Sequence, residues 1–232
     1  SYLAVNDLPG LFTGLARAAG KQVFVGERVQ SGFYLDLFAG DAATNRAIED
    51  QDWDFIILSG GCQTAAYPNT HHMIKEGWGH HDPYPALKAF KDKVSEVNPE
   101  TVLIYMMPWA FEDGITWIPG QTDDYFSMQE SIRANALRWA EELDLSVAPV
   151  GMAWGKIMEQ GVPAHYLHEP DWNHPNPRGS FLSAATLFST VFKERGDQVE
   201  FSWLLPPNEA QNFLKVGSDT VLDSLALWNI GY

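Results

Sequence analysis

The stretch Asp54-Phe55-Ile56-Ile57-Leu58, followed by Ser59-Gly60-Gly61, decides the fold class. Its continuous apolar run would be buried on both faces, which is typical of a central strand in a parallel sheet. The glycine pair at the carboxyl end predicts a loop of the kind in which such sheets place their binding sites. We therefore expect an α/β protein with its site beside residues 59–61.

Strand and helix patterns alternate along the rest of the chain. Further strands are predicted at residues 22–25, 101–107, 145–150 and 201–204, and helices at 6–19, 42–50, 85–97, 125–143, 152–160 and 179–193. Alternation of this kind favours a parallel sheet covered by helices on both faces. The right-handed rule for crossovers then makes a three-layer, doubly wound α/β/α sheet the expected architecture.

The composition fits one globular domain. Hydrophobic residues make up 45% of the 232 residues, which is enough to bury a core of ordinary size. We expect residues 1–232 to form a single domain, with residues 196–232 as an appendage packed on it. Cys62 is the only cysteine, which excludes an internal disulfide and a zinc site built from several cysteines.

The charge and the hydrophobic pattern restrict the partners. The formal net charge of −15 is spread along the chain and repels phosphate backbones, so nucleic acid is not an expected partner. No apolar run of about 18 residues is present, so no membrane span is predicted. The sequence leaves the oligomeric state open and is compatible with a periplasmic, secreted or cytoplasmic location.

The stretch Asp171-Trp172-Asn173-His174-Pro175 carries the clearest catalytic signal. In a turn closed by proline, the three-residue offset lets the Asp171 carboxylate accept a hydrogen bond from Nδ1 of His174, which leaves Nε2 free as a base. Such a pair activates a hydroxyl or a thiol, and we take Ser1 as the candidate nucleophile. Without a catalytic role, Asp171 would cap the following helix and His174 would be incidental. His168 is a rival base, but nothing in the sequence orients it as clearly.

Several motifs together resemble the SGNH, or GDSL-type, hydrolase superfamily. They are Ser1-Tyr2 followed by Asn6-Asp7-Leu8-Pro9, the pair Ser31-Gly32, and the late Asp-x-x-His-Pro of residues 171–175 followed by Gly179-Ser180-Phe181-Leu182. The resemblance is closest to a branch whose first block reads Gly-Asn-Ser-Tyr. It implies a flavodoxin-like strand order of 2-1-3-4-5, with the first strand lying upstream of residue 1.

The resemblance also implies roles for the site residues. Ser1 would attack a carbonyl carbon, His174 would act as the base and Asp171 would orient it. The oxyanion would be held by the backbone N–H groups of Ser1 and Gly32 and by a side-chain amide that follows the third strand.

One block departs from the superfamily pattern. The usual Gly-x-Asn-Asp after the third strand is replaced by Ser59-Gly60-Gly61-Cys62-Gln63, which contains no asparagine. We therefore take Ser59 and Gln63 as the candidate donors to the oxyanion.

Two further groups of side chains are candidate ligand sites. His71, His72, His80 and His81 could suggest a metal, but no metal-ligand spacing is present, so we expect no metal and no other cofactor. The aromatic residues of this region and of the next loop could stack on a sugar ring or cover the edge of the core: Tyr67, Trp78, Tyr84, Trp109 and Trp117. Of these we take Trp109 as the candidate substrate contact.

The sequence thus predicts a serine ester hydrolase that cleaves a small acyl ester, with acetylated carbohydrate among the candidate substrates. Two alternatives stay open. The altered block at residues 59–63 could have abolished catalysis and left a protein that binds carbohydrate or another small ligand. The Asp171 and His174 pair could also serve a lyase, because fold alone does not decide function.

Overall fold

A parallel sheet forms the centre of the protein in its computed structural model, which describes residues 1–67, 81–117 and 122–232. Within these ranges the strands are β1 (Phe55–Ser59), β2 (Val102–Met106) and β3 (Ser146–Ala148), in the order β1-β2-β3. The register places Ile57 beside Ile104 and Tyr105 beside Val147. The run that decides the fold class therefore forms a parallel strand, as predicted. It is an outer strand of the three described ones, however, and of its apolar residues only Leu58 is buried.

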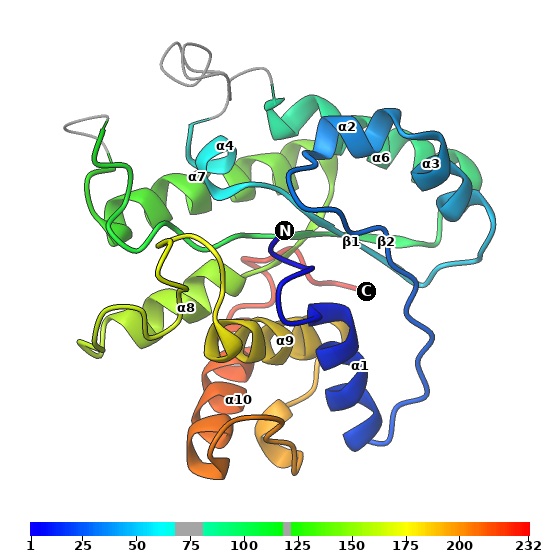
Figure 1. The fold of residues 1–232 in the computed structure, drawn as a ribbon. Coiled ribbons are helices and arrows are strands. Elements are labelled where there is room, and N and C mark those ends of the chain that lie inside the picture. The colour runs from blue at the N-terminus through cyan, green and yellow to red at the C-terminus, as the bar shows by residue number, and fades with distance from the viewer. Residues whose placement is uncertain (68–80, 118–121) are drawn as a thin grey trace.

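Helices cover both faces of this sheet (Figure 1). One face carries α2 (Leu35–Gly40), α3 (Ala42–Glu49), α4 (Cys62–Ala66), α6 (Pro83–Val97) and α7 (Tyr125–Leu143). The other carries α1 (Leu8–Ala18), α8 (Val150–Met158), α9 (Pro177–Phe192) and α10 (Pro207–Leu222), with a 3₁₀ turn, η2 (Gly196–Gln198), before α10. The three-layer α/β/α architecture is confirmed, and the order of the three strands agrees with the 3-4-5 part of the order that the resemblance implies.

Local sequence signals explain where the main helices begin. The Asp7 side chain caps α1 by accepting from the Gly10 N–H, and Asp124 and Ser127 form a reciprocal capping box at α7. Asn176 accepts from the first backbone N–H groups of α9, and a proline at its first position suits the fixed helical φ. These helices lie within one or two residues of their predicted bounds.

Helix α9 is the most deeply buried element on its face of the sheet. All of its residues from 179 to 191 are buried, and it packs against α1, α8 and α10. Its buried hydroxyls remain satisfied because Ser183, Thr186 and Thr190 each donate to the carbonyl one turn earlier, at 2.8 to 2.9 Å. The helix that follows the Asp-x-x-His block is therefore a rigid support for it.

The segment after α10 returns to the sheet. The Val147 N–H donates to the carbonyl of Trp228 at 2.9 Å, and the Ser146 hydroxyl donates to the carbonyl of Asn229 at 2.6 Å. The outer edge of β3 is covered in this way. Among the described helices, none is both long and apolar enough to cross a lipid bilayer.

Two of the predicted strands are wrong. Residues 22–25 form no ladder with a described strand. Phe24 is 74% exposed, and among the described residues its ring stacks on Trp53. Residues 201–204 form no strand. Ser202 to Leu205 make a turn, in which the Leu205 N–H donates to the Ser202 carbonyl at 2.9 Å. The short helix α2 was not predicted.

Candidate active site

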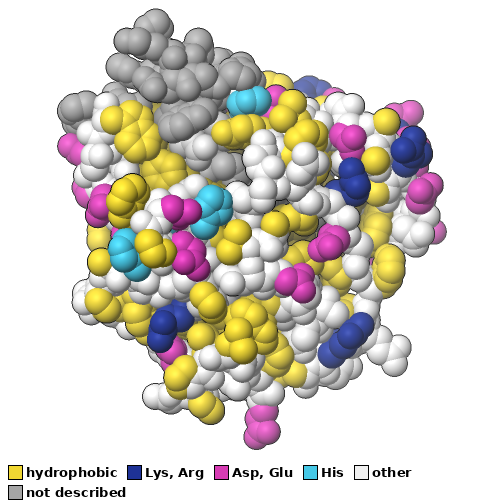
Figure 2. Space-filling model, in the orientation of Figure 1, with side chains coloured by type: hydrophobic (Ala, Val, Ile, Leu, Met, Phe, Trp, Pro, Cys, Tyr) yellow, Lys and Arg dark blue, Asp and Glu magenta, His cyan; other side chains and the backbone are white. Residues whose placement is uncertain are grey.

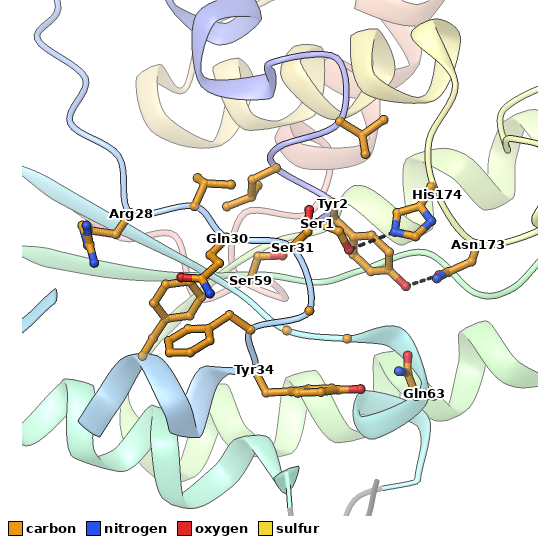
Figure 3. Close-up of a pocket in the computed structure, with 18 of the residues that line it drawn as sticks. Ser1, Tyr2, Arg28, Gln30, Ser31, Tyr34, Ser59, Gln63, Asn173 and His174 are labelled. Carbon is orange, nitrogen blue, oxygen red and sulfur yellow. Dashed lines mark hydrogen bonds between the residues drawn. The ribbon is translucent and has the colours of Figure 1, made fainter. Parts of the chain in front are cut away.

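Ser1, His174 and Asp171 form one chain of hydrogen bonds. Nδ1 of His174 lies 2.7 Å from Oδ2 of Asp171, and Nε2 lies 2.9 Å from Oγ of Ser1. Because a carboxylate can only accept, Nδ1 carries the proton and Nε2 is the acceptor for the serine hydroxyl. Figure 3 shows the Ser1 hydroxyl facing the imidazole ring.

The loop around Asp171 holds this carboxylate ionised. Its Oδ1 accepts from the backbone N–H groups of Asn173 at 3.0 Å and His174 at 2.9 Å, while Oδ2 accepts from the His174 ring. Partial burial opposes ionisation, but these three donors outweigh it and keep the pKa of Asp171 below its usual value. A negative charge therefore stays beside the imidazole.

Backbone pairing and Asn176 fix the shape of the same loop. The Glu169 N–H donates to the His174 carbonyl at 2.7 Å, and His168 and Pro175 form an antiparallel bridge. The side-chain amide of Asn176 donates to the carbonyls of His165, Tyr166 and His168 at 2.9 to 3.2 Å. Asp171 and His174 therefore lie on a loop whose backbone is held by several hydrogen bonds.

The opening segment of the chain is tied to this loop by Asn6. Its side-chain amide donates to the Pro175 carbonyl and to Oγ of Ser180, both at 3.0 Å. The carbonyl of Ser1 in turn accepts from the N–H groups of Ala4 and Val5 in a tight turn. These contacts bring residues 173 positions apart to hydrogen-bonding distance.

Tyr2 forms a second link between the two segments. Its buried hydroxyl donates to Oδ1 of Asn173 and also lies 2.9 Å from Sγ of Cys62. Its ring contacts the Trp109 indole, with centroids 4.6 Å apart, and the edge of the His174 ring. Burial raises the pKa of the Cys62 thiol to about 12, so this cysteine is protonated at neutral pH and is not an alternative nucleophile.

A cavity of about 610 Å³ opens beside the Ser1 hydroxyl, within the size range of small-molecule sites. The predicted oxyanion residues Gly32, Ser59 and Gln63 all line it, together with Tyr34 (Figure 3). Gly32 has a left-handed φ of +71°, which a glycine adopts without strain. Apart from a weak contact of Gln63 Oε1 with Cys62 at 3.5 Å, the Gln63 amide has no partner among the described residues.

Trp109 needs a correction, because it does not line this cavity. Its indole is fully buried and stacks on Trp154 with centroids 4.1 Å apart. Its Nε1–H donates to the backbone carbonyl of Asn173 at 2.9 Å. Trp109 therefore supports the loop from within the core, away from the surface of the cavity.

The remaining aromatic candidates are dispersed. Tyr67 is buried, with its hydroxyl 2.8 Å from that of Thr122, whereas Trp117 is exposed at the surface. Trp78 lies outside the described residues. The predicted loop therefore does not present these rings as one platform in the part of the chain that the structure describes.

The other histidines do not form a metal centre in the described ranges. His81 contacts both carboxylate oxygens of Asp36 at 3.0 Å and stacks on Tyr34, while His71, His72 and His80 lie outside the described residues. No described group of three or more His, Cys, Asp or Glu side chains is arranged to hold a metal ion.

His168 is not a competing base. It is 1% exposed, its Nε2 donates to the carbonyl of Ala110 at 3.0 Å, and burial lowers its pKa. A neutral histidine inside the core has no access to the cavity beside Ser1.

Sequence reasoning did not identify Tyr34, Asn173 and Asn176 as parts of the site, although Asn176-Pro177 is a recognisable helix start.

Comparison with known proteins gives likenesses of structure. No family model and no curated protein matches the chain. A DUF4886 family protein from Bacteroides uniformis ATCC 8492 aligns with a TM-score of 0.73 at 16% identity, covering 91% of this chain and 88% of that one. A protein from Slackia heliotrinireducens described as "a putative SGNH hydrolase" aligns with a TM-score of 0.59 at 19% identity, covering 82% and 94%. At identities this low, the likeness shows a shared fold alone.

Proposed function

We propose that this protein is a serine ester hydrolase of the SGNH type that cleaves a small acyl ester through an acyl-enzyme. The observation that supports the proposal best is the hydrogen-bonded chain from Asp171 through His174 to the Ser1 hydroxyl, at 2.7 and 2.9 Å. A serine hydroxyl becomes a useful nucleophile when an oriented imidazole can take its proton. The shared fold with an SGNH-type protein agrees with this reading.

The reaction has two halves. In the first, Oγ of Ser1 bonds to the ester carbonyl carbon as its proton passes to Nε2 of His174, and the tetrahedral intermediate then expels the alcohol, which takes that proton. In the second, His174 removes a proton from water, the resulting hydroxide attacks the acyl carbon, and the acid leaves as Ser1 recovers its proton. Asp171 stays ionised throughout and stabilises the imidazolium.

The intermediate carries negative charge on the former carbonyl oxygen. The backbone N–H groups of Ser1 and Gly32 and the side chains of Ser59 and Gln63 are the donors that we assign to it, since all four residues line the cavity. The Gln63 amide takes the role that the superfamily pattern gives to an asparagine side chain.

Hydrolysis of p-nitrophenyl acetate tests the proposal. We expect turnover by the wild-type protein and its loss in Ser1→Ala and in His174→Ala. Ser31→Ala is the matched control, because Ser31 lines the same cavity without belonging to the hydrogen-bonded chain. An organophosphorus fluoride should transfer its phosphoryl group to the Ser1 hydroxyl with loss of fluoride and a proton, so the peptide that contains Ser1 should gain the mass of that group less one hydrogen. Turnover that survives Ser1→Ala but not His174→Ala would mean a different nucleophile, as in the lyase alternative.

The competing interpretation is a binding protein without turnover. The absence of an asparagine from the block Ser59-Gly60-Gly61-Cys62-Gln63 favours it. It predicts that ligands bind in the cavity beside Ser1 and that the inhibitor fails to label it. The labelling experiment therefore separates the two functions even when the natural substrate is unknown.

A further inference from the structure

The loop 169–174 separates two cavities. Glu169, Asp171 and Asn173 line the cavity beside Ser1, whereas Trp172 lines a second cavity of about 310 Å³. Because Trp172 lies between two residues of the first cavity, the two hollows share this loop as a wall. Figure 2 shows histidine and acidic side chains among hydrophobic ones on the left of this face, where the yellow loop of Figure 1 lies.

Trp172 presents its indole to solvent from a fixed backbone. The side chain is 55% exposed, although the residue adopts a left-handed φ of +62°, which large side chains rarely do. Its N–H donates to the Glu169 carbonyl, and its carbonyl accepts from the Glu112 N–H, both at 3.0 Å. Packing in the core therefore does not account for this tryptophan, which lines the second cavity.

A second oriented histidine faces the same cavity. Both carboxylate oxygens of Glu112 are used by His165, one by its backbone N–H and the other by Nδ1 at 2.8 Å. The Glu112 side chain is only 7% exposed, so the pair is largely shielded on that side. Nδ1 is engaged, and Nε2 has no hydrogen-bond partner among the described residues. Asp113 adds a carboxylate to the lining.

We propose that this second cavity is a subsite for a neutral sugar ring. The apolar face of the sugar ring would stack on the Trp172 indole. The sugar hydroxyls would form hydrogen bonds with Nε2 of His165 and would donate to the Asp113 carboxylate. The indole and these polar groups suit a ligand with an apolar face and a hydroxyl edge.

The link to catalysis rests on the proposed function. If Ser1 is the nucleophile, the loop 169–174 places an esterified sugar at Ser1 and a neighbouring sugar of the same chain over Trp172. The substrate class is then an acylated oligosaccharide or polysaccharide. Binding of unmodified sugar at the second cavity does not depend on hydrolysis.

The test compares Trp172→Asn and His165→Asn with the wild-type protein. Asparagine tolerates a left-handed backbone, which both positions require, so the loop should be preserved. Trp203→Asn is the matched control: Trp203 is also an exposed tryptophan with a left-handed φ, of +49°, and lies in neither cavity. Binding of cellohexaose, xylohexaose and mannohexaose is measured by calorimetry, with tetramethylammonium as the cationic probe.

We expect the wild type and Trp203→Asn to bind at least one of the hexasaccharides, and Trp172→Asn to bind it about tenfold more weakly. Hydrolysis of p-nitrophenyl acetate should stay within about twofold in all these variants, since that ester does not reach the second cavity. Absence of sugar binding in the wild type, equal binding in Trp172→Asn, or binding of tetramethylammonium alone would overturn the subsite. Loss of ester hydrolysis in the wild type with sugar binding intact would overturn only the link to Ser1.

Discussion

The hydroxyl of Tyr2 donates a hydrogen bond to Oδ1 of Asn173, so the residue after Ser1 is bound to the residue before His174. Ser1 and His174, which exchange a proton in the proposed mechanism, are thus held by a hydrogen bond between their chain neighbours. Trp109 holds the backbone carbonyl of the same Asn173 from the core side. The spacing between Ser1 and His174 is therefore set by contacts beside the hydrogen-bonded chain of Asp171, His174 and Ser1 (the relay).

Tyr2→Phe should weaken both the fold and the proposed activity. Removing the hydroxyl takes away the main donor to the half-buried Oδ1 of Asn173, which keeps a weak contact with the Cys62 thiol at 3.8 Å. The loss of this hydrogen bond should cost about 0.5–1.5 kcal/mol in the free energy of unfolding. The loosened loop should lower kcat for p-nitrophenyl acetate by about 10- to 100-fold. Tyr232→Phe is the control, because it removes a hydrogen bond to the Thr190 carbonyl far from the relay and should cost stability alone. Equal kcat in the two variants would contradict a positioning role for Tyr2.

Asp171→Asn should abolish most turnover while keeping the loop. The asparagine oxygen can still accept the two backbone N–H bonds that Oδ1 of Asp171 accepts, but a side-chain amide no longer holds the proton on Nδ1 of His174. We expect kcat to fall by about 10³- to 10⁴-fold. Glu169→Gln also removes a charge from the cavity wall without touching the imidazole, and it should keep nearly full activity.

Gln63→Ala should reduce kcat by about 10²- to 10³-fold with little change in KM, because an oxyanion donor acts mainly in the transition state. Gln30→Ala removes the same side chain from another part of the cavity wall and serves as the control. If steady-state kinetics show no loss in Gln63→Ala and a clear loss in Ser59→Ala, the donor is the serine.

Asn176→Ala should destabilise the protein and disturb the site together. The change removes the cap of α9 and the donors to three loop carbonyls, at a cost of about 2 kcal/mol or more in the free energy of unfolding. Asn45→Ala, in the opposite helix layer, also loses bonds to backbone carbonyls and should lower Tm without changing kcat. Thermal unfolding and p-nitrophenyl acetate kinetics on the same samples check both expectations.

His168 should make stability depend on pH in mildly acidic solution. Burial lowers its folded-state pKa below the ordinary value of 6.5, so between these two values the unfolded chain binds more protons than the folded one. Its contribution is present above pH 6.5 and is lost as the pH falls below that value, by at most about 1.4 kcal/mol per pH unit. The free energy of unfolding, measured by urea unfolding from pH 7.5 to 5, should fall less steeply with decreasing pH in His168→Gln than in the wild type. Equal pH dependence in the two proteins would refute this assignment.

The sequence by itself determined the features that depend on short-range pattern. The apolar run 55–58 specified a parallel strand, although only Leu58 of it is buried, and three- and four-residue periodicity specified helices such as α7, whose bounds agree with the prediction. The three-residue offset between Asp171 and His174 was enough to predict their hydrogen bond, because a turn brings such neighbours together whatever surrounds it.

Only the tertiary structure decided the features that need a distant partner. Residues 22–25 have strand-forming side chains but pair with no strand in the described part of the chain. Trp109 is buried because it packs on Trp154 and donates to the Asn173 carbonyl. The approach of Ser1 to His174, suggested by family resemblance, depends on Asn6 and Tyr2 contacting residues far away in the chain. A local pattern reports the conformation and burial that a segment prefers, whereas the partner of each side chain is fixed by how the whole chain packs.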